Sequence, residues 1–231
     1  MLLRRRQFAL LPEIVGKRLW SDHVSLGLRC DLSKAAGPPA SLTSLRIRPV
    51  RPRDEPLFTS GSEGREAADA AFLFESDLRT CYVAETATGT VCYMQYLIES
   101  SQNGELRRLF GDLYPPLAND EVLLEGALTL PKFRGRGIAL FAIPSLLSRA
   151  HAAGANSALL YASVDNTPML KASKRCGFVP FVLRRERFRL FVHRLAVVPL
   201  PEGQPYPFDG VGGASPLRLS GEDAARAPDA G

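Results

Sequence analysis

EVLLEGALTLPKFRGRGIA, residues 121–139, is the stretch that decides the fold of this 231-residue chain. Its first part, Glu121–Leu130, is a largely apolar run that predicts a buried strand. The run passes through a basic turn with two glycines, Arg134–Ala139, into a helix that we expect to last until about Ala153. A second apolar run, Ser157–Val164, predicts another strand after that helix. The order strand, turn, helix, strand is typical of an α/β protein.

The turn has the composition of a phosphate-binding site. Gly135 and Gly137 have no Cβ atoms, so backbone amides can approach a ligand closely where the loop enters the helix. The first turn of a helix also has N–H groups without intrahelical partners, and the helix dipole makes that end positive. Arg134 and Arg136 add guanidinium groups that suit phosphate oxygens. No Gly-Lys-Ser/Thr follows and the spacing is not Gly-x-Gly-x-x-Gly, which excludes a P-loop and a dinucleotide fingerprint.

Arg134-x-x-Gly137-x-Ala139 resembles the Arg/Gln-x-x-Gly-x-Gly/Ala acyl-CoA signature of the GNAT superfamily of N-acetyltransferases. The order of the elements that follow, with Asn166 and a terminal Gly177-Phe178, strengthens the resemblance. It implies an α/β fold with a mixed, mostly antiparallel central sheet flanked by helices. It also implies a splayed V between two parallel strands.

In the family, a bulge separates these two strands, and the freed backbone groups bind the pantetheine arm of the donor. Gly126 is well suited to such a bulge or to a close backbone approach. The donor-binding residues that the resemblance implies are Leu128, Thr129, Leu130, Arg134, Gly135, Arg136, Gly137, Ile138, Ala139 and Asn166.

The activity implied by the resemblance is transfer of an acetyl group from acetyl-CoA to an amine, by direct attack in a ternary complex. Glu125 is the candidate base, because a carboxylate leaving a mainly apolar strand would be desolvated and would accept a proton more readily. The alternative is a carboxylate paired with one of the many arginines. Ser173 occupies the position where family members often place a tyrosine that protonates the thiolate. A serine is a much weaker acid than tyrosine, so water is the alternative proton donor.

Two other functions stay open on the sequence. One is an acyltransferase of the same fold that uses a longer acyl-CoA or an acyl carrier protein as donor, since a basic surface suits an acidic carrier. The other is a CoA-binding module without catalysis, which the serine at position 173 favours. The resemblance implies that acceptor choice depends on a helical region at 55–78, a long connection at 100–120 and the N-terminal extension. Connections as long as 100–120 often form a lid over a binding site.

Composition excludes several classes of protein. The net charge is +5 and the arginines are not interleaved with aromatic residues, so a nucleic-acid module is not expected. The cysteines and histidines are scattered, which predicts no metal site and no disulfide framework, and favours the reducing cytoplasm. No apolar run approaches the ~20 residues of a membrane span.

The chain is predicted to have three parts: an N-terminal extension and linker (1–43), a GNAT-like acyltransferase domain (44–198) and a flexible C-terminal tail rich in glycine and proline (199–231). Val179–Val198 is interpreted as two closing antiparallel strands joined at Arg184–Arg187. Two strand-like runs, Arg79–Thr86 and Thr90–Ile98, predict a hairpin around Gly89. Helical spacing is also present at Phe8–Trp20, and a short helix is predicted at Glu105–Phe110. Strand edges and the N-terminal segment leave a homodimer open.

Overall fold

The computed structural model describes residues 20–35, 37–38, 44–60, 64–190 and 192–209. Its strands follow the order β2-β3-β4-β5-β6-β1-β7-β8 in one mixed sheet. The sheet is mostly antiparallel with β5 and β6 parallel, which confirms the predicted fold class. The chain divides into two compact units, which we describe separately.

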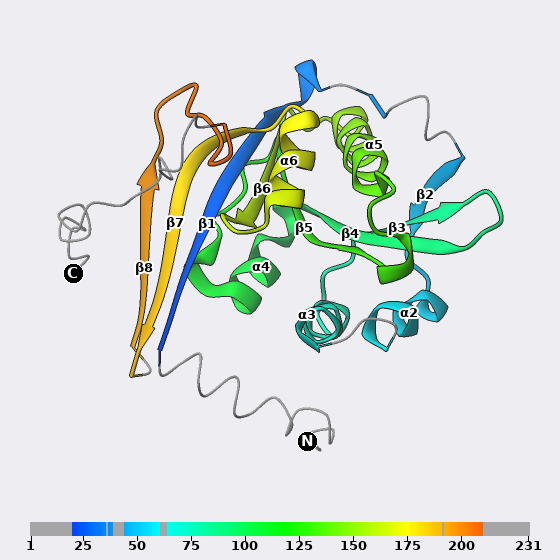
Figure 1. The fold of residues 1–231 in the computed structure, drawn as a ribbon, viewed down its shortest axis with the longest axis horizontal. Helices are drawn as coiled ribbons and strands as arrows, with labels where there is room; N and C mark the ends of the chain where they lie inside the picture. The colour runs from blue at the N-terminus through cyan, green and yellow to red at the C-terminus, as the bar shows by residue number, and fades with distance from the viewer. Residues whose placement is uncertain (1–19, 36, 39–43, 61–63, 191, 210–231) are drawn as a thin grey trace. The chain divides into compact units, whose positions relative to one another are not determined.

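The larger unit comprises residues 28–161 and 168–179 and contains most of the sheet (Figure 1). The predicted hairpin around Gly89 is present as an antiparallel pair, β3 and β4. The predicted pair of strands on either side of the basic turn is present as β5 and β6. The strands of this unit are β2 (Leu45–Pro49), β3 (Cys81–Thr86), β4 (Val91–Glu99), β5 (Glu121–Thr129) and β6 (Ser157–Ser163), the last of which ends outside the unit.

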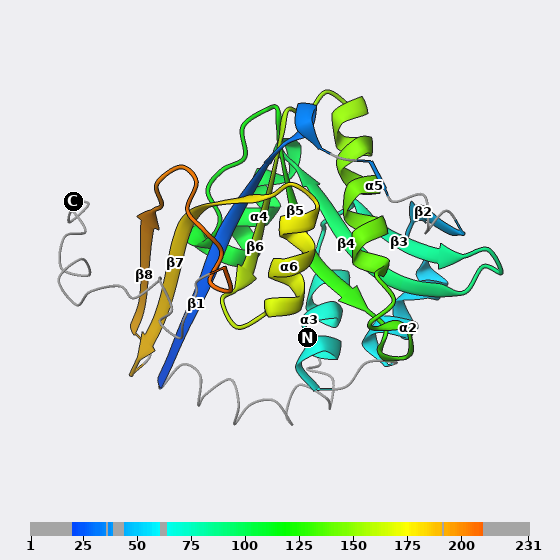
Figure 2. The ribbon, with the colours of Figure 1, turned by 45° about the horizontal axis from the view of Figure 1, so that its top comes forward.

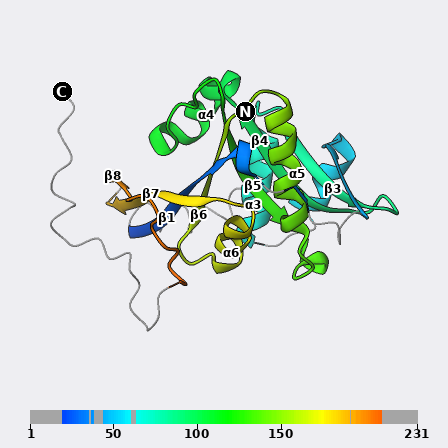
Figure 3. The same cartoon turned by 90° about the horizontal axis from the view of Figure 1, so that it is seen from above.

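Helices cover both faces of these strands. The helix after the basic turn, α5 (Ile138–Ala152), lies on one face, while α2 (Glu55–Thr59) and α3 (Gly64–Phe74) lie on the other (Figures 1 and 2). Seen from above, α5 crosses the strands, and it contacts β2, β4 and β5 (Figure 3). Apolar side chains of α5 and the strands between the layers are fully buried, among them Leu123, Leu124, Ile143 and Leu146.

The predicted long connection at 100–120 is mostly helical. It contains α4 (Asn103–Phe110), where a short helix was expected, between two single 3-10 turns. The end of this connection is bound to the start of α4 through Asn103. The Asn103 side chain donates to the carbonyl of Leu117 and accepts from the Leu117 amide, at 2.9 Å each. None of the described helices is long and apolar enough to cross a membrane.

The smaller unit contains β1 (Trp20–Asp31) up to Gly27, nearly all of β7 (Val179–Arg189) and β8 (Val192–Pro199). The prediction that Arg184–Arg187 connects two strands was wrong, since these residues lie inside β7 and pair with β8. Their guanidinium groups have partners within the sheet: Arg184 donates to Ser25 at 3.0 Å and lies 3.8 Å from Glu186, and Arg185 donates to both carboxylate oxygens of Asp22. The hydrogen bond from Arg185 holds the pKa of Asp22 below its usual value.

The predicted terminal segments are only partly described. The helix-like run before Trp20 and residues 210–231 of the predicted tail lie outside the described residues. Within the described part of the tail, Tyr206 is buried and its ring stacks on Phe208 with 5.2 Å between centroids. The tail as far as residue 209 therefore contributes to packing.

Candidate functional site

The two parallel strands separate part of the way along. Their ladder begins with Glu121 opposite Ser157 and ends with Leu124 opposite Leu160. Both strands continue beyond this point, β5 as far as Thr129 and β6 as far as Ser163. The splayed V predicted from the sequence is therefore present, with Glu125 and Tyr161 as the first residues past its apex.

A bulge in β5 lies directly after that apex. Tyr96 of β4 pairs with Glu125 and Met94 pairs with Leu128, so Gly126 and Ala127 together oppose the single residue Gln95. Gly126 has a φ of +64°, and a Cβ atom there would lie 2.4 Å from the Cδ1 atom of Leu73. Both the backbone conformation and the close approach of α3 require glycine, as the sequence suggested.

The bulged strand exposes backbone groups on its open edge. The amide of Leu130 donates to the carbonyl of Cys92 at 3.0 Å, so this N–H points toward β4. Because successive residues of a strand direct their N–H and C=O groups to opposite edges, those of Thr129 point away from β4. The Thr129 carbonyl accepts a hydrogen bond from Arg134 Nε at 3.2 Å. The Thr129 amide is thus an available donor at the open edge of the V.

The basic turn has the geometry expected of an anion site. Gly135 and Gly137 both have left-handed backbone conformations, with φ of 74° and 73°, and Gly137 is the N-cap of α5. In the described part of the chain, the amides of residues 135–139 donate to no backbone carbonyl. The cations of Lys132 and Arg136 lie 5.0 and 5.7 Å from the ring centroid of Phe133. Unpaired amides at a helix N-terminus beside cations favour phosphate.

Arg134 connects the turn to both β5 and α3. Besides its bond to the Thr129 carbonyl, its guanidinium donates to the carboxylate of Glu66 in α3. Both side chains are about half exposed, at 48% each. The pair holds the turn in place, and phosphate oxygens would compete with Glu66 for the same guanidinium.

Within the described residues, Glu125 accepts hydrogen bonds at both carboxylate oxygens. Its Oε1 atom accepts from the amide of Gly126 at 3.0 Å and its Oε2 atom accepts from the hydroxyl of Tyr114 at 2.5 Å. Sequence reasoning missed Tyr114, because nothing in the pattern around it differs from an ordinary loop tyrosine. The tertiary structure brings it to the base candidate.

The second catalytic candidate, Ser173, faces the core. It lies in α6 (Thr167–Arg175), its side chain is 0% exposed, and its hydroxyl has no hydrogen-bond partner in the described structure. The carbonyl of Ser173 accepts from the amide of Phe178, and that of Lys174 accepts from Gly177, both at 3.1 Å. Gly177 and Phe178 thus end α6 in a Schellman motif, which explains the terminal Gly-Phe pair.

The remaining donor candidates fall in different places. Asn166 directly precedes α6 and belongs to the smaller unit, so its predicted role toward the donor stays a prediction. Leu128 and Leu130 are nearly buried in the larger unit, while Thr129 between them is half-buried. Ile138 and Ala139 form the first turn of α5, where their side chains pack against the core beside Tyr93.

Replacing Ser173 with alanine is expected to leave the free energy of unfolding unchanged or to raise it by up to about 1 kcal/mol, because a buried hydroxyl without a partner stabilises nothing. Urea unfolding measures the change. Ser145→Ala is the matched control, since the Ser145 hydroxyl donates to the carbonyl of Phe141 at 2.7 Å. A loss of more than 1 kcal/mol in Ser173→Ala would mean that the hydroxyl has a partner.

All four cysteines are buried as free thiols. Burial, the largest effect at each, raises the pKa of Cys30 and Cys92 to about 11, and that of Cys81 and Cys176 to about 12. Because the thiolate is the reactive form, we expect the native protein to react with a thiol reagent at pH 8 far more slowly than free cysteine does. After denaturation, all four thiols should be accessible and should react rapidly with the same reagent. Fast reaction of any thiol in the native protein would contradict this.

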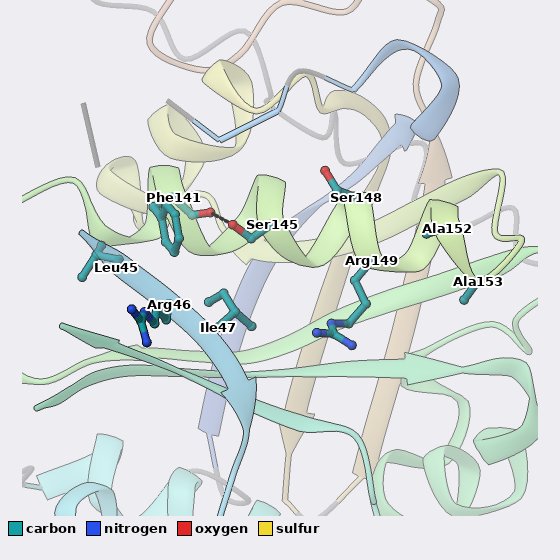
Figure 4. A pocket seen from close by; sticks show the side chains of 9 residues that line it. All are labelled: Leu45, Arg46, Ile47, Phe141, Ser145, Ser148, Arg149, Ala152 and Ala153. Carbon is teal, nitrogen blue, oxygen red and sulfur yellow. Dashed lines mark hydrogen bonds between the residues drawn. The ribbon is translucent and has the colours of Figure 1, made fainter. Parts of the chain in front are cut away.

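A separate open groove runs between β2 and α5 (Figure 4). Its volume is about 840 Å³, and its charged residues are Arg46 and Arg149. The Arg149 guanidinium lies 5.1 Å from the ring centroid of Tyr82. The groove includes neither Glu125 nor any residue of the basic turn, so it is distinct from the splayed strands.

Comparison with known proteins supports the fold. No family model and no curated protein matches the sequence. Among solved structures, the GCN5-related glucosamine N-acetyltransferase region of a fungal multi-domain GH3 β-N-acetylglucosaminidase has a TM-score of 0.56 at 14% identity, over 81% of this chain and 23% of that one. An acetyltransferase of the GNAT family from Colwellia psychrerythraea has a TM-score of 0.51 at 13% identity, over 85% of this chain and 62% of that one. A Drosophila protein also has a TM-score of 0.51, at 14% identity, over 81% of this chain and 58% of that one.

The chain therefore spans less than two thirds of the length of these three proteins. At such identities the likeness establishes the fold alone. The chain has the fold of the GNAT acetyltransferases, and the resemblance of the sequence to that superfamily is confirmed at the level of fold.

Proposed function

We propose that this protein is an N-acetyltransferase that moves an acetyl group from acetyl-CoA to an amine. The observation that carries the proposal is the open edge of β5. There the bulge at Gly126 and the amide of Thr129 lead directly to the amides of the basic turn, and within the described residues none of these amides has a backbone acceptor. This arrangement suits an extended ligand with a pyrophosphate at one end and a thioester at the other. The fold neighbours support acyl transfer in general.

In the proposed reaction, the turn binds the pyrophosphate and the open edge of β5 binds the pantetheine arm. The Thr129 amide donates to the thioester carbonyl and stabilises the oxyanion that forms when the amine attacks. The new C–N bond forms, the C–S bond breaks, and the CoA thiolate leaves. Glu125, directly or through water, takes the proton that the amine loses. Ser173 or water protonates the thiolate.

The test is release of free CoA thiol from acetyl-CoA in the presence of a panel of primary amines. We expect amine-dependent release that falls by at least about a hundredfold in Glu125→Gln, as is typical when a general base is removed. Glu75→Gln is a matched control, because Glu75 is an exposed glutamate just beyond α3. A fall in turnover in Ser173→Ala would support the serine as proton donor, and unchanged turnover would favour water.

The same assay separates the alternative functions. Release from longer acyl-CoA or from an acyl carrier protein, but not from acetyl-CoA, would replace the proposed donor. Binding of acetyl-CoA without release in the presence of any amine would favour a non-catalytic module. The buried, scattered thiols support a location in the cytoplasm as part of the proposal.

A further inference from the structure

The groove between β2 and α5 lies at an edge of the sheet (Figure 4). β2 is the first strand in the order of the sheet, and within the described residues it pairs with β3 alone. The amide of Val50, directly after β2, donates to the carbonyl of Cys81 in β3 at 2.9 Å. Because successive residues direct their N–H and C=O groups to opposite edges, Leu45 and Ile47 direct theirs away from β3. The edge beside the groove therefore presents backbone donors and acceptors.

α5 forms the other wall of the groove. Its lining residues recur every three or four positions, which places them along one side of the helix. They are Phe141, Ser145, Ser148, Arg149 and Ala152, followed by Ala153 at the helix end. This wall is about 16 Å long, the length of about five residues of extended chain. A strand edge beside a helix, with an open volume of about 840 Å³ between them, suits a peptide that adds to the sheet as a strand.

The charged residues that line the groove are both cationic. Arg46 and Arg149 are exposed, and no acidic residue is among the nine that line it. Within the described residues, no carboxylate forms an ion pair with either of them. The neighbouring Arg48 differs, because two carboxylates neutralise its charge. The groove thus has a positive charge that an acidic partner complements.

The pleat of β2 selects the sequence pattern of such a partner. Leu45 and Ile47 pack against the cluster that contains Ile138 and Ala142 of α5. By the period of two, the Arg46 side chain leaves the strand on the other face. An added strand would therefore place apolar side chains beside Leu45 and Ile47, and an acidic side chain beside Arg46. The expected pattern is an alternation of apolar and acidic residues.

A second copy of this chain fits the edge less well than an acidic peptide does. If two β2 strands paired Leu45 of one copy with Ile47 of the other, the Arg46 residues of the two copies would lie directly opposite each other. Like charges in that position destabilise a sheet, whereas an aspartate or glutamate opposite Arg46 would stabilise it. The charge of the edge therefore favours a partner with a different sequence.

We propose that an extended acidic segment of a partner protein binds in this groove as an additional strand on β2. Its apolar residues alternate with aspartate or glutamate, and its acidic side chains pair with Arg46 and Arg149. The inference goes beyond the proposed function, since the groove shares no residue with the basic turn and does not include Glu125. Its success or failure is independent of acetyl-CoA binding.

The test is fluorescence anisotropy of the full chain with a labelled heptapeptide in which aspartate and valine alternate. The comparison peptide has lysine in place of aspartate. We expect the aspartate peptide to bind at least about tenfold more tightly, and the double variant Arg46→Ser, Arg149→Ser to lose this preference. Arg65→Ser with Arg107→Ser is the matched control, because it removes the same charge at exposed positions outside the groove and should keep the preference.

Methylation of the peptide's backbone nitrogens tests the strand geometry. In an antiparallel addition, the valines opposite Leu45 and Ile47 direct their N–H groups to β2, whereas in a parallel addition the aspartates do so. Methylating all valines or all aspartates should therefore weaken binding at least about tenfold in one peptide and leave the other nearly unchanged.

Three results would overturn the inference: equal affinities for the aspartate and lysine peptides, a preference that survives in the double variant, or binding that neither methylation weakens. If the aspartate peptide does not bind and sedimentation shows that the chain is a dimer, a second copy replaces the acidic peptide as the occupant of the edge.

Discussion

Replacing Gly137 with glutamate is expected to reduce the affinity for acetyl-CoA on the order of a hundredfold while leaving the chain folded, if two charge-assisted hydrogen bonds are lost. Gly137 is the N-cap of α5 with φ of 73°, and it lies among amides that donate to no backbone carbonyl of the described residues. A glutamate side chain would fill the approach to these amides and would repel the pyrophosphate.

A thermal-shift titration measures this effect, because a ligand that binds only the native state raises the melting temperature by mass action. Acetyl-CoA should stabilise the wild type and not the variant. Gly89→Glu is a closely matched control: Gly89 has φ of +77°, and a Cβ atom there would meet nothing within 4 Å. This control places the same charge and a similar backbone strain in the β3–β4 hairpin, and it should retain acetyl-CoA binding.

If Gly137→Glu and the wild type respond equally to acetyl-CoA, the basic turn does not bind the donor. If a folded wild type responds to neither acetyl-CoA nor longer acyl-CoA, the proposed function loses its donor site. A response to longer acyl-CoA alone would favour a longer acyl chain.

Replacing Asp54 with asparagine is expected to lower the free energy of unfolding by about 1–3 kcal/mol, because buried donors lose a charged hydrogen-bond acceptor. Asp54 is 3% exposed. Its carboxylate accepts from Arg48 at 2.6 and 3.1 Å and from the amide of Arg51 at 2.8 Å. Arg48 also donates to Glu85 at 2.7 Å, so its charge stays neutralised in the variant, but its two hydrogen bonds to a buried carboxylate are lost or weakened.

The destabilisation should depend on pH. Burial acts to raise the pKa of Asp54, but the hydrogen bonds from Arg48 and the Arg51 amide outweigh burial and hold this pKa below its usual value. Stability from a lowered pKa is present above the unfolded value of about 3.9 and is lost as the pH falls through the folded value. The difference between wild type and Asp54→Asn should therefore be full at pH 7 and shrink below about pH 4.

Urea unfolding of both proteins at several pH values measures this dependence. Asp112→Asn is the control, because Asp112 is 88% exposed and lies 4.0 Å from Arg107. Its effect should stay under about 1 kcal/mol at every pH. A pH-independent loss in Asp54→Asn would mean that the side chain acts through packing and not through its charge.

Local chemistry made the basic turn and the bulge predictable. Gly135 and Gly137 lie just before a helix. Glycine at such positions indicates a turn with left-handed backbone conformations, which both residues adopt. Gly126 interrupts an apolar strand, and it is the residue at which the bulge occurs. Each of these features depends on residues within a few positions of one another, so the pattern along the chain contains them.

The aromatic ring contacts around Tyr114 were not predictable, because no local pattern marks them. Phe72, Phe110, Tyr114 and Tyr161 lie in separate segments, and each by itself has the appearance of an ordinary packing residue. Only the fold brings their rings into contact and places Tyr114 against Glu125. The environment of Ser173 was equally unpredictable from the sequence, and the structure shows its side chain to be fully buried.

The interpretation of Arg184–Arg187 as a connection was wrong for the same reason, because the contacts that place these residues in a strand come from distant segments. A run of charged residues favours a loop when its neighbours are unknown, but here Asp22 and Ser25 from β1 satisfy the arginines within the sheet. The sequence by itself determined the α/β class, the hairpin around Gly89, the bulge and the basic turn, since these follow from residues close together in the chain. The tertiary structure alone decided the extent of β7, the burial of Ser173 and the partners of Glu125. These three features depend on contacts between segments that are distant in the sequence, and the spacing of neighbouring residues does not reveal the free energy of such contacts.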